Sequence, residues 1–385
     1  MAVCQAKMPS CVYAGEGCIA NIKDILHKEN AKSVLVFTDR GIEKSGILRL
    51  LTDELDAAGA VYTVFDDLKA EPAYTDVEQV LEEAQKAEGD FVIAMGGGSV
   101  MDAAKLVSLL KGASYTIRDL LKDPALAGKQ LHSAMIPTTC GTGAEATCNA
   151  IVAIPEEETK KGIVNDAMIP DYVLLDPRTI AKLPKTIVAA TGVDALAHVV
   201  ECYTSKKATM LSDTYALEGA KLIFGNIRKA YLNPEDSEAK SAMMLGAYYG
   251  GVAITASGTT AVHALSYPLG GKYHIAHGVS NAILFAHVME YNLEACRDQL
   301  AGLCDVIAPQ LYGEDKSVKA RYVIDQIADI VKVTEIPTDL GAFGVKKEDL
   351  DFLVTAGSQQ KRLLVNNRRE LSLEDIRNIY MKVLR

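Results

Sequence analysis

The chain has 385 residues, 49% of them hydrophobic, which is enough apolar material for two well-packed domains. Its formal net charge of -10 argues against the basic patches that bind nucleic acid. No apolar run approaches the roughly 20 residues needed to span a bilayer, and no signal-peptide pattern is present, so we expect a cytoplasmic protein that contacts neither nucleic acid nor membrane.

The first half of the chain alternates short β-branched runs with segments of helical pattern. This order is typical of a parallel sheet with helices on both faces. The alternation stops at Leu183-Pro184, so we expect an α/β domain over residues 1–183, in which the charged stretch from Glu156 to Lys161 is a solvated loop. Strands are predicted at 33–38, 60–65, 90–95, 133–137 and 173–175.

Beyond Pro184 the apolar residues recur at helical spacing, and β-branched runs become scarce. We therefore expect an all-α domain over residues 184–385. Helices are predicted at 187–203, 211–224, 237–251 and 280–292, near 323–331, and at 373–383.

The eight cysteines form no CxxC pair. A chain of this length needs no disulfide to fold. We expect free thiols, most of them buried, at Cys4, Cys11, Cys18, Cys140, Cys148, Cys202, Cys296 and Cys304.

A glycine-rich loop, Gly96 to Ser99, directly follows the apolar strand that ends at Met95, and residues 100–106 after it have good helix propensity. Glycines let the backbone approach a pyrophosphate closely, and the N-terminus of the next helix favours negative charge. The loop therefore predicts a dinucleotide site. Because it is not the GxGxxG fingerprint, a plain tight turn stays an alternative.

A second loop at a strand end, Pro137 to Glu145, carries Thr138, Thr139 and Thr142 among two glycines. Two such loops at the ends of parallel strands predict one shared ligand crevice. The alternative is that the threonines cap a helix.

A third strand end carries Asp39 and Arg40. The Asp39 carboxylate would accept hydrogen bonds from ribose hydroxyls and repel a 2′-phosphate, which favours NAD over NADP. Arg40 would instead attract that phosphate, and Asp39 as a helix N-cap is a further alternative.

Histidines and a carboxylate gather in the second half of the chain. Asp194 and His198 are four residues apart in a predicted helix, so both project from one face. His263, His274 and His277 follow within 15 residues, among only seven histidines in the chain. A carboxylate with several imidazoles suits Fe(II), Zn(II), Mn(II) or Co(II), whereas each histidine alone would be a hydrogen-bonded core residue.

With these motifs together, the sequence resembles the iron-containing (group III) alcohol dehydrogenase family along essentially its whole length. The matching segments are Tyr13 to Gly17, Gly96 to Lys105, Pro137 to Glu145, Gly192 to His198, and His263 to Leu265 with His277-Gly278.

The resemblance implies the dehydroquinate synthase-like fold, an α/β dinucleotide-binding domain followed by a helical domain, with Fe(II) or alternatively Zn(II) in the cleft. It also implies NAD, or alternatively NADP, and a homo-oligomer, expected to be a homodimer. The implied metal ligands are Asp194, His198, His263 and His277. The residues implied to lie along the cofactor are Asp39, Gly97, Gly98, Ser99, Asp102, Thr138, Thr139, Thr142, Thr147, Asn149 and Lys161.

The sequence departs from the family pattern at two places. Tyr267 stands where a second histidine, considered for the proton relay, is common, and Glu71-Pro72 stands where an Asn-Pro pair is common. The proton route therefore stays open between Tyr267, His274 and a metal-bound water.

We expect an NAD(P)- and metal-dependent alcohol dehydrogenase or aldehyde reductase that acts on a primary alcohol or diol. Two alternatives use the same scaffold, namely glycerol dehydrogenase-like polyol oxidation and an NAD-using lyase similar to dehydroquinate synthase. A third alternative is a non-catalytic relative that binds a metal or a nucleotide.

Overall fold

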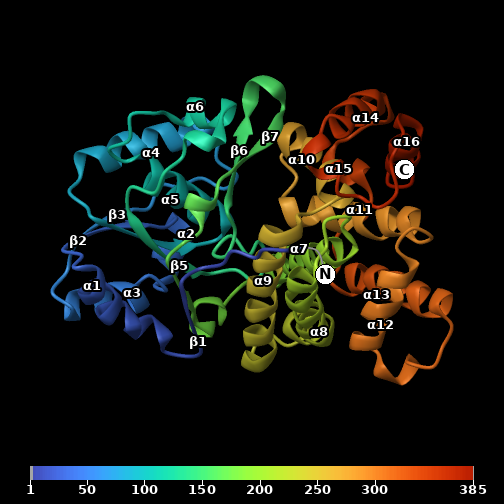
Figure 1. The fold of residues 1–385 in the computed structure, drawn as a ribbon, viewed down its shortest axis with the longest axis horizontal. Helices are drawn as coiled ribbons and strands as arrows, with labels where there is room; N and C mark the ends of the chain where they lie inside the picture. The colour runs from blue at the N-terminus through green and yellow to red at the C-terminus, as the bar shows by residue number, and fades with distance from the viewer. Residues whose placement is uncertain (1–2, 385) are drawn as a thin grey trace.

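The computed structural model describes residues 3–384 and shows a sheet-based half beside a helical half (Figure 1). The main sheet has six parallel strands in the order β1-β8-β5-β4-β2-β3. In chain order they are β1 (Cys11–Ala14), β2 (Ser33–Phe37), β3 (Val61–Phe65), β4 (Phe91–Gly96), β5 (His132–Pro137) and β8 (Tyr172–Leu175). The five strands expected from the sequence are therefore present, and the edge strand β1 was not foreseen.

Helices cover both faces of this sheet. Along β2, Val34 and Val36 pack into one apolar cluster, whereas Leu35 and Phe37 pack into another, because successive side chains of a strand point to opposite faces. All six residues of β4 are buried, as expected for a central parallel strand between two helical layers. The first layer contains α1 (Ile22–Glu29) and α3 (Arg49–Ala57), and the second contains α4 (Tyr74–Lys86) and α5 (Gly98–Leu110).

A hairpin outside the main sheet was not expected. Its strands, β6 (Asn149–Ile154) and β7 (Thr159–Val164), pair antiparallel and lie between the sheet and the helical half (Figure 1). The expectation of a solvated loop from Glu156 to Lys161 is wrong from Thr159 onward. Pairing with β6 places Thr159 and Lys160 in the interior, where both are buried.

The second half is helical, as predicted, and its helices share one apolar cluster, to which a few residues of the first half also belong. Its helices are α7 (Lys185–Thr204), α8 (Met210–Leu232), α9 (Ser237–Ser257), α10 (Ala261–Tyr273), α11 (His277–Asn292), α12 (Arg297–Ile307), α13 (Lys316–Val333), α14 (Leu350–Ser358), α15 (Lys361–Leu364) and α16 (Leu373–Met381).

The helix α10 was not foreseen, because Pro268, Gly270 and Gly271 interrupt its helical pattern in the sequence. The hairpin requires glycine at position 271, where an added side chain would meet backbone, whereas at position 270 it would meet only the end of the Lys160 side chain. A Cβ on Gly271 would lie 2.5 Å from the carbonyl oxygen of Glu158, and one on Gly270 would lie 2.6 Å from Nζ of Lys160. The missing side chains therefore let β7 pack directly on α10.

All eight cysteines are free and six of them are buried, which confirms the expectation from their spacing. None of the helices within residues 3–384 combines the length and the apolar character needed to cross a membrane.

Candidate metal and cofactor site

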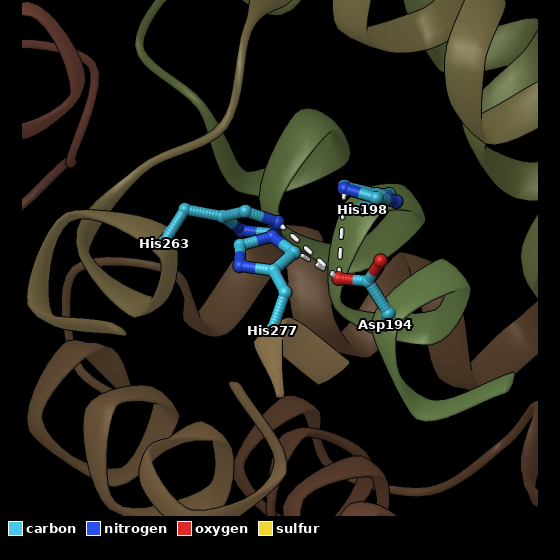
Figure 2. A group of neighbouring side chains, drawn as sticks. All are labelled: Asp194, His198, His263 and His277. Carbon is cyan, nitrogen blue, oxygen red and sulfur yellow. Dashed lines mark ion pairs between the residues drawn. The ribbon is translucent and has the colours of Figure 1, made fainter. Parts of the chain in front are cut away.

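Three helices bring one carboxylate and three imidazoles together (Figure 2). Asp194 and His198 come from consecutive turns of α7, His263 comes from the first turn of α10, and His277 is the first residue of α11. Oδ1 of Asp194 lies 3.7 Å from Nε2 of His198 and 3.6 Å from Nε2 of both His263 and His277. The four potential ligand atoms all lie within 4.8 Å of one another.

The charges of this cluster suit a bound cation. Burial opposes ionisation of Asp194, but the three imidazoles outweigh it and hold the pKa of the carboxyl well below its usual range. Burial also lowers the pKa of His198, and it lowers that of His277 to about 3. Burial lowers the pKa of His263 as well, but the carboxylates of Glu201 and Asp194 outweigh it and raise that pKa to about 9. A divalent metal binds imidazole in its neutral form, so a bound ion would displace one proton from His263 and keep Asp194 as the carboxylate.

Hydrogen bonds fix the direction of two of the imidazole rings. Nδ1 of His198 lies 3.3 Å from the carbonyl oxygen of Gly141, and Nδ1 of His263 is held by the carboxylate of Glu201. A partner on Nδ1 fixes the tautomer that leaves Nε2 free to coordinate. In both rings it is Nε2 that faces Asp194.

Asn281 provides a test of whether a metal ion fits. Its amide nitrogen lies 2.7 Å from Oδ1 of Asp194, 3.2 Å from Nε2 of His263 and 3.3 Å from Nε2 of His277. Its amide oxygen is buried and has no hydrogen-bond partner. If the amide turned by 180°, its oxygen would face the space between Asp194, His263 and His277, and a cation there would give that oxygen a partner. The residues present therefore fit a divalent ion.

The cluster opens into a cavity of about 400 Å³ that also contains the glycine loop. Among the residues expected along the cofactor, Gly98, Ser99, Asp102, Thr142, Thr147 and Asn149 line it, together with all four expected metal ligands and Tyr267. The structure thus brings the two candidate sites of the sequence into one space.

The two loops at the strand ends touch each other within this cavity. A Cβ on Gly98 would lie 2.7 Å from Cγ2 of Thr142, so the close approach requires glycine. Gly98 begins α5, and no side chain caps this N-terminus. Its free backbone N–H groups are therefore available to an anion such as a pyrophosphate.

Other residues expected along the cofactor lie at the same sheet edge but do not line the cavity. Gly97 is the N-cap of α5, and Thr138 and Thr139 follow β5. Asp39 caps α2 (Arg40–Ser45), because its Oδ1 accepts hydrogen bonds from the backbone N–H groups of Gly41 and Ile42. In its local contacts Asp39 is therefore a helix N-cap, which was the alternative to a role at the ribose.

Two residues expected at the site point elsewhere. Nζ of Lys161 pairs with Glu157 at 2.6 Å on the exposed side of β7, and strand alternation turns Lys160 inward to line the cavity. His274 is exposed and has a left-handed backbone conformation at the end of α10, with φ of 54°. It does not line the cavity, whereas Tyr267 does.

The departure at Glu71-Pro72 has a structural role. The backbone N–H of Glu71 donates to Oγ of Ser99 at 2.9 Å. Its carboxylate pairs with Nζ of Lys160 at 2.9 Å and accepts a hydrogen bond from the backbone N–H of His277 at 3.2 Å. Glu71 thus joins the glycine loop, the hairpin and a metal-ligand segment.

Sequence reasoning missed Glu201, Asn281 and Lys160. A signal existed for the first two, since Glu201 lies three residues after His198 and Asn281 lies four residues after His277, both on the same helix face as the ligand. Lys160 gave no such signal, because its direction depends on the unforeseen hairpin.

Comparison with known proteins gives two family matches along the chain. The family of iron-containing alcohol dehydrogenases matches residues 9–177, and the C-terminal part of the Fe-containing alcohol dehydrogenase family matches residues 188–384. The chain is 35% identical over 388 residues to long-chain-alcohol dehydrogenase 1 of Geobacillus thermodenitrificans (strain NG80-2), covering 99% of this chain and 96% of that protein.

Two solved structures are similar over nearly their whole lengths. A 1,3-propanediol oxidoreductase superimposes with a TM-score of 0.93 at 26% identity, covering all of both chains. A sulfoacetaldehyde reductase from Bifidobacterium kashiwanohense in complex with NAD⁺ gives a TM-score of 0.88 at 28% identity, covering 100% of this chain and 99% of that one.

Proposed function

Because this chain belongs to the iron-containing alcohol dehydrogenase family and is an alcohol or aldehyde oxidoreductase, we propose that it transfers hydride between NAD and a primary alcohol or diol at a resident Fe(II) ion. Zn(II) is the alternative metal. The proposed ligands are Asp194, His198, His263 and His277, and the observation that carries the proposal is that these four share one cavity with the glycine loop.

The absent groups would supply the reactive chemistry: a divalent ion polarises the oxygen of the alcohol or aldehyde, and the nicotinamide carries the hydride. The protein positions both. The uncapped N-terminus of α5 at Gly98 and Ser99 would hold the cofactor pyrophosphate. Thr142, Thr147, Asn149 and, in place of Lys161, Lys160 would line the rest of the cofactor's path.

We propose Tyr267 as the proton donor to the carbonyl oxygen during aldehyde reduction. It is buried, lines the cavity, and its ring centroid lies 6.1 Å from that of His277. Burial raises the pKa of its hydroxyl, and the nearby Arg362 only partly opposes this effect, so the phenol carries its proton at neutral pH. His274, exposed and outside the cavity, is the weaker candidate.

The preference for NAD over NADP is proposed from Asp39. Its carboxylate stands at the end of β2, on the same sheet edge as the glycine loop. The neighbouring Arg40 is paired with Asp67 at 3.0 Å, which reduces its availability to a 2′-phosphate. Replacing Asp39 with Ser should raise activity with NADPH relative to NADH.

We further propose a cytoplasmic homodimer. The strand β1 is an edge of the main sheet, and its outer backbone groups are available to a second copy of the chain. Val12 within the strand, and Val3 and Met8 before it in the chain, expose apolar surface. Light scattering of the purified protein would give the mass, and a monomer would contradict the proposal.

One paired experiment tests the proposed function. Anaerobically purified protein is analysed for metal, and NAD or NADP is then assayed with primary alcohols, diols and their aldehydes. We expect about one divalent ion per chain and substrate-dependent NADH formation. His263→Ala should lose both the metal and the activity. Full metal content without turnover on any substrate would contradict the enzymatic assignment.

A further inference from the structure

The cavity contains two cationic side chains that no carboxylate balances. Its three carboxylates are all engaged, since Glu71 pairs with Lys160 at 2.9 Å, Asp102 pairs with Lys105 at 2.9 Å, and Asp194 belongs to the metal cluster. Lys207 and Arg362 also line the cavity, and neither forms an ion pair within residues 3–384.

The guanidinium of Arg362 is positioned against the wall of the cavity. A Cβ on Gly162 of β7 would lie 3.1 Å from Nη2 of Arg362, so the guanidinium rests over a residue without a side chain. Nε2 of Gln360 donates to Oγ1 of Thr159 at 3.3 Å, which ties the segment before Arg362 to the same strand. The hairpin thus directs the charge inward, although the residue as a whole is exposed.

One aromatic side chain separates this charge from the metal cluster. Burial raises the pKa of the Tyr267 hydroxyl, and the guanidinium beside that hydroxyl partly offsets the rise. The ring centroid of Tyr267 lies 6.1 Å from that of His277. A substrate group bound by Arg362 would therefore lie only a short distance from the alcohol or aldehyde oxygen of the same substrate at the metal cluster.

Lys207 reaches the cavity from the same half of the chain. The backbone N–H of the preceding Lys206 donates to the carbonyl oxygen of Asn366 at 2.8 Å, and Asn366 also lines the cavity. Both cations therefore come from the helical half, whereas the anion site for the cofactor at Gly98 comes from the sheet half.

We propose that the substrate carries an anionic group, a carboxylate or sulfonate, a few bonds from its alcohol or aldehyde carbon, and that Arg362 and Lys207 bind this group. This inference rests on the proposed function. A guanidinium presents paired N–H donors that match two oxygens of such an anion. Lys207 and Arg362 are both exposed, so water solvates their charges when no substrate is present. An anionic substrate would replace part of that water with charge-assisted hydrogen bonds that a neutral substrate cannot form.

The test compares substrates of equal reach that differ in charge. Metal-loaded protein is assayed with NADH and two pairs, sulfoacetaldehyde against butanal and succinic semialdehyde against pentanal. We expect kcat/KM of the wild type to be at least about tenfold higher for the anionic member. Arg362→Ala should lower kcat/KM for the anion by about 10- to 100-fold, mainly through KM, the loss expected for charge-assisted hydrogen bonds.

Matched variants separate the effect of Arg362 and Lys207 from the effect of any nearby positive charge. Lys207→Ala should also reduce the anionic preference, and Arg362→Lys should restore part of it. The exposed neighbours provide the controls, since Lys361→Ala and Lys206→Ala remove the same charges from side chains that do not line the cavity. Neither control should change the preference.

Three outcomes would overturn the inference while leaving the proposed function intact: equal kcat/KM for both members of each pair, equal losses for both members in Arg362→Ala, or a rise in the KM for NADH with every aldehyde. The last would assign the cations to the cofactor.

Failure of all aldehydes would contradict the proposed function instead. In that case calorimetric binding of 2-hydroxyethanesulfonate, lost in Arg362→Ala, would still support the anion site, and equal binding would reject it.

Discussion

The carboxylate of Glu201 binds Nδ1 of His263 and so turns Nε2 of the same ring toward Asp194. Glu201 is fully buried, and its other oxygen accepts hydrogen bonds from the backbone N–H groups of Thr260 at 3.0 Å and Val262 at 2.8 Å. A carboxylate from α7 therefore fixes both the start of α10 and the tautomer of His263, the proposed ligand on that helix.

Replacement of Glu201 by Gln should weaken metal binding. The amide carries no negative charge and has one acceptor oxygen where Glu201 has two, so it cannot accept from both Nδ1 of His263 and the backbone N–H groups of Thr260 and Val262 as the carboxylate does. We expect metal affinity to fall by about 10- to 100-fold, the range seen when such outer partners are lost. Competition with a chromophoric chelator measures it. Glu218→Gln, at an exposed site on α8, is the control, and unchanged affinity in a folded Glu201→Gln protein would disprove the role.

A second prediction concerns the amide beside the cluster. Asn281→Ala removes a group that contacts three of the four expected ligands. We expect about tenfold weaker metal binding, since the orienting contact to Asp194 is lost. Asn292→Ala is the matched control, because this residue is also buried on α11 but bonds to Asn367. It should lower stability without changing metal affinity, and equal effects of the two variants would show that Asn281 is only structural.

The pairing of Asp194 with His198 was predictable because its signal is local. Asp194 and His198 are one helical turn apart, and this spacing alone places them on one face. The glycine loop was likewise visible, since a strand, a glycine turn and a helix follow each other directly in the chain. Both features depend on short-range geometry that the sequence determines. The family resemblance then supplied the pairing of His263 and His277 with the first two residues.

The position of Lys160 was not predictable in the same way. The direction of a strand residue depends on which partner it pairs with and in which register, and a shift by one residue exchanges the two faces. The charged run from Glu156 to Lys161 reads as a loop when considered alone. Only the pairing of β7 with β6, and their packing on the glycines of α10, assigns Lys160 to the interior and Lys161 to the exterior.

The proton route provides a third prediction. Tyr267→Phe keeps the ring that packs on His277 and removes only the hydroxyl. If this hydroxyl donates the proton, kcat for aldehyde reduction should fall about 100-fold, at the low end of general acid catalysis. His274→Ala should keep kcat within about twofold, since that residue is exposed and lies outside the cavity. The opposite pattern, measured in the same steady-state assay, would assign the relay to His274.

A pH-dependent prediction follows from a buried carboxyl group outside the cavity. Glu145 is 2% exposed, and burial raises its pKa to about 7, from an ordinary value of 4.5. Between these two pH values the folded chain binds more protons at this position than the unfolded chain. Stability should therefore fall as pH rises through this range, and the loss should persist above about pH 7.

Glu145→Gln removes this ionisation while keeping the shape of the protonated side chain. At pH 5 the variant and the wild type should unfold at similar denaturant concentrations. At pH 8 the variant should be more stable by roughly 3 kcal/mol, the free energy that corresponds to a pKa raised from 4.5 to about 7. Glu157→Gln, at an exposed site, should show no such difference.

Metal is kept saturating at both pH values, because loss of the ion would affect every variant alike. A stability difference that is the same at pH 5 and pH 8 would show that Glu145 does not pay a burial cost for its charge.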